Sequence, residues 1–325
     1  MLCASVVNPS LLKTAMPQVS VIIPTHNRSD FLRSAIASVL NQTYQDYELI
    51  VVDDASTDNT AEAVAEFSDK RIKLLRHETT KGGSAARNTG ILASECDYIA
   101  LLDDDDEWLP DKLSKQMEVL LSSPSEVGCV YTGYVDVSRS TEKTIGEYRP
   151  TQRGDLSKDL LAGNCVGSAS SVLLKRECLK KVGLFDESLP CAQDYDLWIR
   201  IANEFLFECV SEPLFKYHVH ENKISTNLKT LSSGLEIMAK KYHNYPLSYY
   251  RNQYVDIGII YCRAGHIKEG REAFFKAIRL SPIQLRGYLN FCLTLFGAEN
   301  FGKLKEAQRK TFAFLHKGSV PVGRG

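Results

Sequence analysis

Four apolar segments, separated by segments with helical spacing, constrain the fold of this chain more than any other feature. They are rich in β-branched residues and occupy residues 19–25, 47–54, 71–77 and 97–103. Over residues 29–42, apolar side chains recur every three or four positions, as on one face of a helix that Ser29 or Asp30 can cap. Strands in which apolar and polar residues do not alternate, separated by amphipathic helices, are typical of a parallel sheet that is covered on both faces. The sequence therefore predicts an α/β fold with a mostly parallel sheet.

The rest of the chain divides into a less regular part and a helical part. We expect strands at 127–138 and 206–220 and a helix at 191–205. After Thr226 the pattern is helical, so we place a boundary there. The predicted organisation is a leader over 1–17, an α/β domain over 18–225 and a helical C-terminal region over 226–325.

Composition excludes several classes of protein. No window approaches the roughly 18 to 20 apolar residues that a membrane span needs, and the leader lacks the basic start of a secretion signal. The nine cysteines are scattered and never stand in C-x-x-C spacing, which indicates reduced thiols and argues against a structural zinc site. We therefore expect a cytoplasmic globular protein.

The net charge of −1 conceals an asymmetry along the chain. From Thr226 onward there are 16 Lys or Arg against 6 Asp or Glu, whereas residues 1–225 carry 23 against 34. A basic segment can dock on anionic lipid or nucleic acid, or it can be the solvated surface of a helical region. Charge alone leaves these alternatives open.

Polar residues stand where three of the predicted strands end. Pro24 and Thr25 end the first strand, Asp53 and Asp54 end the second, and Asp103 to Asp106 end the fourth. Ligands of parallel α/β sheets bind at the carboxyl ends of the strands. The three clusters are therefore expected to converge on one binding edge.

The stretch LLDDDDEWLP, residues 101–110, places four aspartates side by side. Like charges repel by about 1 kcal/mol per close pair in water and by several times more in a protein, so an offsetting group is expected. Mg²⁺ or Mn²⁺ would offset the charge, and such ions are usually held by one or two carboxylates plus substrate phosphates. The alternative is a solvated acidic loop that leads into the next helix, which Pro110 favours.

Other candidate residues give weaker signals. Asp194, on the predicted helix at 191–205, is suited to accept a proton from a hydroxyl. His218 and His220 alternate on an extended segment and point to one side, where imidazoles can meet a metal or a phosphate. Arg87 lies near a helix start, where it can meet a phosphate or the carboxylates.

Five motifs together resemble the family 2 glycosyltransferases, which are inverting enzymes with the GT-A fold that use nucleotide-diphosphate sugars. The resemblance runs from about Gln18 to His220. The motifs stand in the family's order: VSVIIPTHNR, LIVVDDASTDNT, GGSAARNTGI, YIALLDDDDEW and QDYDLWIRIA. The resemblance implies a Rossmann-like GT-A fold.

The resemblance also implies roles for individual residues. Seven residues would bind the nucleotide sugar. Asp54 would recognise the base and Asp103 would lie near the ribose. The others in this set are Pro24, Thr25 and Asn27, which would line the nucleotide pocket, together with Arg87 and Asp104. The metal would be held by Asp105 and His220, with Asp106 beside Asp105, and His220 can also approach the diphosphate. Asp194 matches the proposed catalytic base. Two departures from the family pattern are Gln193, where an acid is usual, and Asp104, where a small residue is usual.

The implied reaction is a single displacement at the sugar. Asp194 would deprotonate an acceptor hydroxyl, while Mn²⁺ or Mg²⁺ at Asp105 would stabilise the departing nucleoside diphosphate. The implied donor is a UDP-sugar, and the implied acceptor is a glycan or a lipid-linked molecule of cell-surface polysaccharide synthesis. No nucleic-acid partner is implied.

The C-terminal region resembles one tetratricopeptide hairpin at about residues 251–282. Tyr254, Gly258, Phe274 and Pro282 are among the positions that match this pattern. The helical region would pack on the α/β domain or a second subunit. Alternatively, its basic face would hold the enzyme on an anionic membrane at the inner face, with 285–297 as the apolar contact.

Two other classes of function compete with the enzyme. The strand that ends in an acidic pair is also typical of a phospho-signalling receiver domain, although Asp194 then has no role. A catalytically silent nucleotide-sugar-binding scaffold would share the fold. The intact Asp105 and Asp194 argue against that scaffold.

Overall fold

The computed structural model describes residues 18–219, 228–242 and most of 254–301, without 256, 260, 263–264, 281, 283–284 and 298–299. The predicted leader over 1–17 and the candidate ligand His220 lie outside the described residues. The chain forms two compact units. Unit 1 comprises 1–155, 166–185 and 200–219, and unit 2 comprises 156–165, 186–199 and 220–325.

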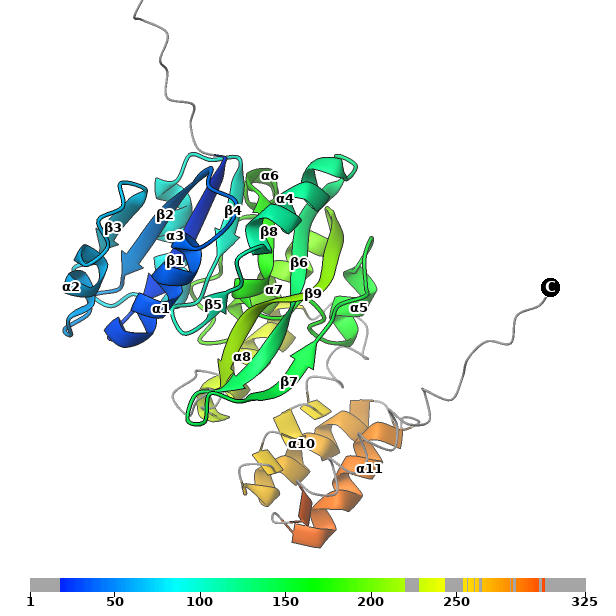
Figure 1. Cartoon of the computed structure of the whole chain (residues 1–325). Helices are drawn as coiled ribbons and strands as arrows, with labels where there is room; N and C mark the ends of the chain where they lie inside the picture. Colours follow the sequence, from blue (N-terminus) through cyan, green and yellow to red (C-terminus); the bar gives the residue numbers. More distant parts are fainter. Residues whose placement is uncertain are drawn as a thin grey trace, which may run out of the picture. The chain divides into compact units, whose positions relative to one another are not determined.

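The first four strands form the parallel sheet that the sequence predicts (Figure 1). The elements are β1 (Val19–Thr25), α1 (Ser29–Leu40), β2 (Tyr47–Asp53), α2 (Thr60–Ala65), β3 (Ile72–Arg76), α3 (Gly83–Ala93) and β4 (Tyr98–Leu101). The strand order is β3-β2-β1-β4, and each neighbouring pair is parallel. All residues of β1 and β2 are buried, which explains why most of them are apolar. The Glu48 carboxylate inside β2 is paired there with Ser20 and Lys73.

Beyond β4 the sheet becomes mixed. The elements are β5 (Glu107–Trp108), α4 (Lys112–Ser122), β6 (Val127–Ser138), β7 (Thr144–Tyr148), α5 (Ser157–Ala162), η2 (Ala169–Ser171), β8 (Val172–Lys175), α6 (Arg176–Val182), α7 (Gln193–Ala202) and β9 (Leu206–Val219). The order continues as β4-β8-β6-β9-β5, and β7 pairs with β6. Strand β8 runs antiparallel to both β4 and β6, whereas β9 is parallel to β6. The α/β architecture is as predicted.

The prediction that Ser29 or Asp30 caps α1 is wrong. The position before the helix is Arg28, and no side chain there makes a capping hydrogen bond. Instead, the Asp58 carboxylate accepts a hydrogen bond from the Ser29 backbone N–H at 3.0 Å and another from the Thr60 N–H at 3.2 Å. One aspartate therefore satisfies N–H groups at the starts of both α1 and α2.

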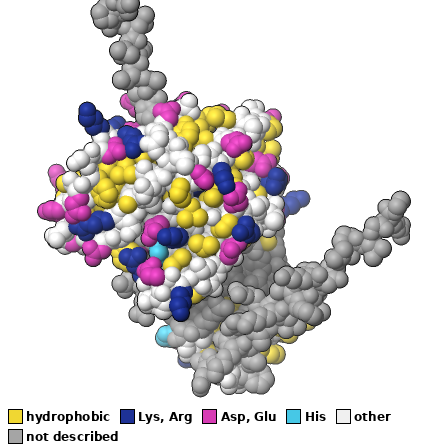
Figure 2. Space-filling model, in the orientation of Figure 1, with side chains coloured by type: hydrophobic (Ala, Val, Ile, Leu, Met, Phe, Trp, Pro, Cys, Tyr) yellow, Lys and Arg dark blue, Asp and Glu magenta, His cyan; other side chains and the backbone are white. Residues whose placement is uncertain are grey.

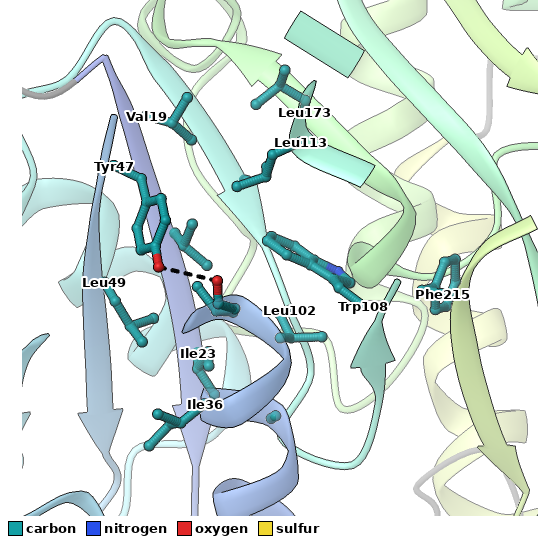
Figure 3. Packing of buried hydrophobic residues seen from close by; sticks show 14 of the residues in the cluster. Val19, Ile23, Ile36, Tyr47, Leu49, Leu102, Trp108, Leu113, Leu173 and Phe215 are labelled. Carbon is teal, nitrogen blue, oxygen red and sulfur yellow. Dashed lines mark hydrogen bonds between the residues drawn. The ribbon is translucent and has the colours of Figure 1, made fainter. Parts of the chain in front are cut away.

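The core of unit 1 lies between the sheet and the helices that cover it (Figure 3). Tyr47 is buried there, and its hydroxyl donates to the Val39 carbonyl at 3.0 Å. Trp108 is buried in the same cluster, and its indole N–H donates to the Ser170 carbonyl at 3.0 Å. Because each polar group has an acceptor, both large aromatic side chains are accommodated in the interior.

Unit 2 is mainly helical in its C-terminal part. Its elements after residue 219 include α8 (Leu228–Lys241), α10 (Ile267–Leu280), α11 (Leu285–Leu293) and η4 (Thr294–Phe296). A small core forms around Phe274 from α10, together with Val255, Cys262 and Phe301. Within the described ranges, no helix combines the length and the apolar composition that a membrane crossing needs.

Candidate active site

The four consecutive aspartates form a tight turn between β4 and β5. The Asp106 N–H donates to the Asp103 carbonyl at 3.1 Å, which closes the turn. The side chains of Asp104, Asp105 and Asp106 are almost completely buried, whereas that of Asp103 remains one quarter exposed. Burial on this scale requires partners for the charges, and the structure supplies them from several distant segments.

Arg28, in the loop after β1, bridges two of the acids. Its guanidinium lies 3.0 Å from Asp104 Oδ1 and 3.2 Å from Asp105 Oδ2. Thr25, the last residue of β1, donates its hydroxyl to the other Asp104 oxygen at 2.8 Å. The end of β1 and the acidic turn are thereby joined, as the convergence of strand ends predicts.

Arg87 neutralises a third acid. Its guanidinium donates to Asp103 Oδ1 at 2.6 Å and lies over the Phe185 ring, 5.5 Å from the centroid. The sequence offered a phosphate or the carboxylates as partners for this arginine, and the structure shows the carboxylate contact. A hydrogen bond between charged groups at this distance is among the stronger ones in proteins.

Ser170 and His218 hold the fourth acid. The Ser170 hydroxyl donates to Asp106 Oδ2 at 2.7 Å and accepts a hydrogen bond from the Asp103 N–H at 3.1 Å. The His218 backbone N–H donates to Asp106 Oδ1 at 3.3 Å. Every aspartate of the run therefore has a protein donor, so the chain itself offsets much of the repulsion that the sequence assigned to a metal.

Burial raises the pKa of Asp104 to about 6, and the neighbouring Asp105 charge acts in the same direction. The Arg28 charge and the hydrogen bonds from Thr25 and Arg28 act against this rise. The Asp104 side chain is only 6% exposed, so the ionised form has little water to stabilise it. This residue therefore differs electrostatically from an ordinary solvated acid.

Asp54 stabilises a loop rather than standing open at the end of β2. Its carboxylate accepts hydrogen bonds from the His77 ring at 2.7 Å, from the Lys81 N–H at 2.8 Å and from the Gly82 N–H at 2.7 Å. Burial alone would raise the pKa of Asp54, but these hydrogen bonds outweigh it and lower the pKa. The buried His77 ring also contacts the Thr89 hydroxyl, so these contacts tie the end of β2, the loop after β3 and α3 together.

The other residues assigned to the nucleotide pocket lie in the same region. Pro24 lies in β1 beside Val52 of β2. Asn27 has a positive φ of 53° and uses its side-chain oxygen to accept from the Thr57 N–H at 2.7 Å. Its own N–H donates to Ser56 at 2.8 Å. Asn27 thus fixes the loop after β1 against the loop after β2.

Asp194 lies in the first turn of α7, within unit 2, and is partly buried. Its Oδ1 accepts a hydrogen bond from the Tyr195 N–H at 2.7 Å. The preceding Ala192 has a positive φ of 57°, an uncommon conformation for a residue with a Cβ. Unit 1 therefore assembles the acidic turn with Thr25 and Arg87, whereas Asp194 belongs to unit 2.

A divalent cation would need oxygen ligands at this strand end. Among the described residues, no group of three or more His, Cys, Asp or Glu side chains could hold a metal ion. Magnesium-type sites need fewer protein ligands, because substrate phosphates and water complete the shell. Asp105 lies at this strand end with its Oδ2 at 3.2 Å from Arg28, and a single carboxylate of this kind can supply one oxygen ligand to such a shared site.

Sequence reasoning missed several residues that build this site. Arg28, His77 and Ser170 had no assigned role, and the one available signal was the position of Arg28 just beyond a strand end. His218 was considered beside His220 as a metal or phosphate contact. Instead, its Nε2 lies 3.0 Å from Glu107, and this hydrogen bond leads the interactions that lower the pKa of Glu107 to about 2.

Comparisons with known proteins identify the family to which this fold and acidic strand end belong. The family model described as "Glycosyl transferase family 2" matches residues 20–183. The chain belongs to this family and is a glycosyltransferase of the GT-A fold. This membership removes the receiver domain as an alternative.

Two relatives with assigned names are similar over most of their length. One is the UDP-Glc:alpha-D-GlcNAc-diphosphoundecaprenol beta-1,3-glucosyltransferase WfgD of Escherichia coli, 34% identical over 74% of this chain and 93% of the relative. Another is the putative teichuronic acid biosynthesis glycosyltransferase TuaG of Bacillus subtilis, 31% identical over 65% of this chain and 82% of the relative.

Two solved structures share the fold at low sequence identity. TarS 1–349 of S. aureus in complex with UDP-GlcNAc has a TM-score of 0.59 and 15% identity, covering 90% of this chain and 92% of that one. The mannosyltransferase PcManGT of Pyrobaculum calidifontis, in complex with GDP-Man and Mn²⁺, has a TM-score of 0.57 and 19% identity, covering 87% and 81%.

Proposed function

We propose that this glycosyltransferase is a metal-dependent, inverting enzyme that moves a sugar from a nucleotide diphosphate to a hydroxyl of a glycan or lipid-linked acceptor. The observation that carries the proposal is the acidic turn at the carboxyl end of β4, joined by Arg28 to the end of β1. Two relatives are named for transfer to a diphosphoundecaprenol-linked sugar and for teichuronic acid biosynthesis. We therefore place the reaction in cell-surface polysaccharide synthesis.

A UDP-sugar is the proposed donor. The name of the E. coli relative includes UDP-Glc, and the S. aureus neighbour was solved with UDP-GlcNAc. In this proposal Asp103 receives the ribose and Asp54 fixes the loop that meets the base. Pro24, Thr25 and Asn27 line the pocket from the neighbouring strand end.

Asp194 is the proposed catalytic base. Its carboxylate accepts the proton of the acceptor hydroxyl, and the freed oxygen attacks the anomeric carbon from the side opposite the diphosphate. The sugar is therefore transferred with inversion. A divalent cation, when bound by Asp105, would supply positive charge for the leaving diphosphate. Arg28 holds the Asp105 carboxylate in place, and Arg87 holds that of Asp103.

Replacement of the proposed base tests the reaction. Asp194→Asn should lower the rate of sugar transfer by about 10²-fold or more, because general base catalysis typically contributes at least that much to the rate. Binding of the UDP-sugar, followed by thermal shift, should be retained. Asp159→Asn, a change in α5 of the same unit, is the control. Unchanged turnover of Asp194→Asn would remove Asp194 from this role.

The metal ligand is tested by donor titration. Asp105→Ala should weaken donor binding measured with Mn²⁺ and leave binding without Mn²⁺ nearly unchanged, so the metal response disappears. Asp69→Ala, a surface acid of unit 1, is the control. Equal metal responses in Asp105→Ala and the parent would contradict the assignment.

We also propose a tetratricopeptide-like hairpin in the C-terminal region. A Cβ added at Gly258 would lie 2.5 Å from the Phe274 ring, and one at Gly270 would overlap the Cys262 sulfur. Glycine is therefore needed at position 258 and at position 270 of α10, because a side chain at either position would overlap the opposite segment. Such close contact between two antiparallel helices is consistent with the repeat pattern.

The proposed membrane contact is the exposed apolar side of α11. Leu285, Tyr288 and Leu289 are 71%, 40% and 45% exposed, at positions that share one helix face, and the surrounding region carries a basic surplus. Leu285→Ser/Leu289→Ser should reduce flotation with anionic vesicles. Leu92→Ser, in unit 1, removes an equally exposed leucine and should not. Equal flotation of the parent and the double variant would end this proposal.

A further inference from the structure

The helix α8 contacts the segment that carries Asp194, and all the contacts lie within unit 2. Asp196, two residues after Asp194, is completely buried. The Lys241 ammonium, near the end of α8, lies 2.8 Å from Asp196 Oδ1 and 2.6 Å from Asp186 Oδ2. The neighbouring Tyr242 donates its hydroxyl to Asp196 Oδ1 at 2.6 Å. One lysine therefore joins the loop before α7 to α7 itself.

The other end of α8 contacts the start of the same segment. Cys191 stands just before α7, and its thiol lies 3.5 Å from the Thr230 carbonyl. A Cβ added at Gly234 would overlap the Cys191 sulfur, so the two backbones are in close contact. Between these contacts lies Ala192 with its positive φ. Two contacts far apart along α8 therefore hold the backbone on both sides of Asp194.

The periodicity of the helix directs Asp194 away from this contact. Successive residues of an α-helix are rotated by about 100°, so residues two apart point in nearly opposite directions. Asp196 is buried toward α8, whereas Asp194 is only partly buried. The ion pair behind the helix consequently fixes the direction in which Asp194 is presented.

We propose that Lys241 and Tyr242 are positioning residues for Asp194, so that α8 is part of the catalytic machinery although it lies beyond the residues matched by the family model. The inference rests on the proposed function, in which Asp194 is the base. When a buried carboxylate loses its cationic partner, its uncompensated charge destabilises the local structure that holds it. Removal of Lys241 would therefore disturb the backbone that presents Asp194. Small displacements of a catalytic group can reduce turnover by up to about 10²-fold.

Tyr242→Phe is the most conservative test, because it removes one hydroxyl and retains the ring. Lys241→Met removes the charge, and Lys241→Arg retains it. Lys276→Met is the matched control, since this lysine of unit 2 faces Glu236 at 3.9 Å with both side chains more than half exposed. The readouts are kcat, donor KM, donor binding by thermal shift, and circular dichroism.

Tyr242→Phe and Lys241→Met should lower kcat by about 10- to 100-fold with donor KM changed less than about threefold, because the base is misplaced while the donor site is intact. Lys241→Arg should recover most of the loss, and Lys276→Met should behave like the parent. In an Asp194→Asn background, Tyr242→Phe should cause no further loss, since both changes act through one group.

Unchanged kcat in folded Tyr242→Phe and Lys241→Met would overturn the inference. So would a loss of activity that merely parallels a loss of folded protein. These results are distinct from failure of the proposed function, in which the parent and Lys276→Met would themselves transfer no sugar.

Discussion

Arg28 should be the most sensitive single residue for the stability of the acidic turn. Its guanidinium is about one quarter exposed, whereas the Asp104 and Asp105 side chains are 6% and 7% exposed. At an effective dielectric constant of about 20, opposite unit charges 3.0 Å apart attract by about 5.5 kcal/mol, before desolvation and the repulsion between the acids are subtracted. Removing one partner of a buried ion pair typically costs about 3 to 5 kcal/mol.

Arg28→Met should therefore lose about 3 kcal/mol, the lower end of this range, because water reaches the guanidinium. For a domain of this size the midpoint of thermal unfolding should fall by roughly 6 to 12 °C. The measurement is urea and thermal unfolding at pH 7.5 without donor. Arg33→Met is the control, since Arg33 also meets two carboxylates, Asp30 and Glu66, but on the surface, where water screens such pairs and they contribute little to stability.

A second substitution tests the reason for the loss. Asp104→Asn in the Arg28→Met background removes one of the two charges that Arg28 had neutralised, so it should recover at least about half of the lost stability. The reasoning is refuted if Arg28→Met costs no more than Arg33→Met, or if Asp104→Asn lowers the stability of Arg28→Met further.

Three further changes have defined outcomes. Gly90→Ala places a methyl group 2.5 Å from a buried side chain of β1, so urea unfolding should show a loss of up to about 2 kcal/mol, whereas Gly163→Ala, with nothing within 4 Å, should stay within about 0.5 kcal/mol of the parent. Burial lowers the pKa of Lys112, so the folded state binds fewer protons than the unfolded state and stability should rise as pH increases toward about 10. Lys112→Met should lose this rise between pH 7 and 9.5, and parallel stability profiles would contradict the reasoning. Burial raises the pKa of Asp186, but hydrogen bonds from Lys241 and Ser188 and the Lys241 charge outweigh it and lower the pKa to about 2, below the unfolded value of about 3.9. The contribution of Asp186 to stability is therefore present above pH 4 and disappears as pH falls toward 2. The stability difference between the parent and Asp186→Asn should therefore shrink from pH 5 to pH 3, and a constant difference would exclude this linkage.

On the face shown in Figure 2, acidic and basic side chains are interspersed with apolar ones. The four aspartates are instead largely enclosed, and their partners come from the ends of β1 and β9, from α3 and from η2. Internal charge pairing therefore defines this region better than the overall charge of the chain.

Local pattern was sufficient for the first four strands and for the strand ends that meet at one edge of the sheet. Buried parallel strands need apolar residues on both faces, so β1, β2 and β4 were visible in the sequence, and the carboxyl ends of parallel strands meet by topology. The contact of Thr25 with Asp104 follows from that rule. The insertion of β8 between β4 and β6 did not follow from it, because antiparallel pairing depends on the route of a long connection.

The sequence by itself determined the α/β architecture, the acidic strand end and the resemblance to family 2 glycosyltransferases, because these depend on residues close together in the chain. Only the tertiary structure decided which groups neutralise the acids. Arg28 meets Asp104 across 76 positions, and Tyr242 meets Asp196 across 46. The choice among many lysines and arginines is made by the directions in which loops and helices present them once the core has packed. Local periodicity does not encode those directions.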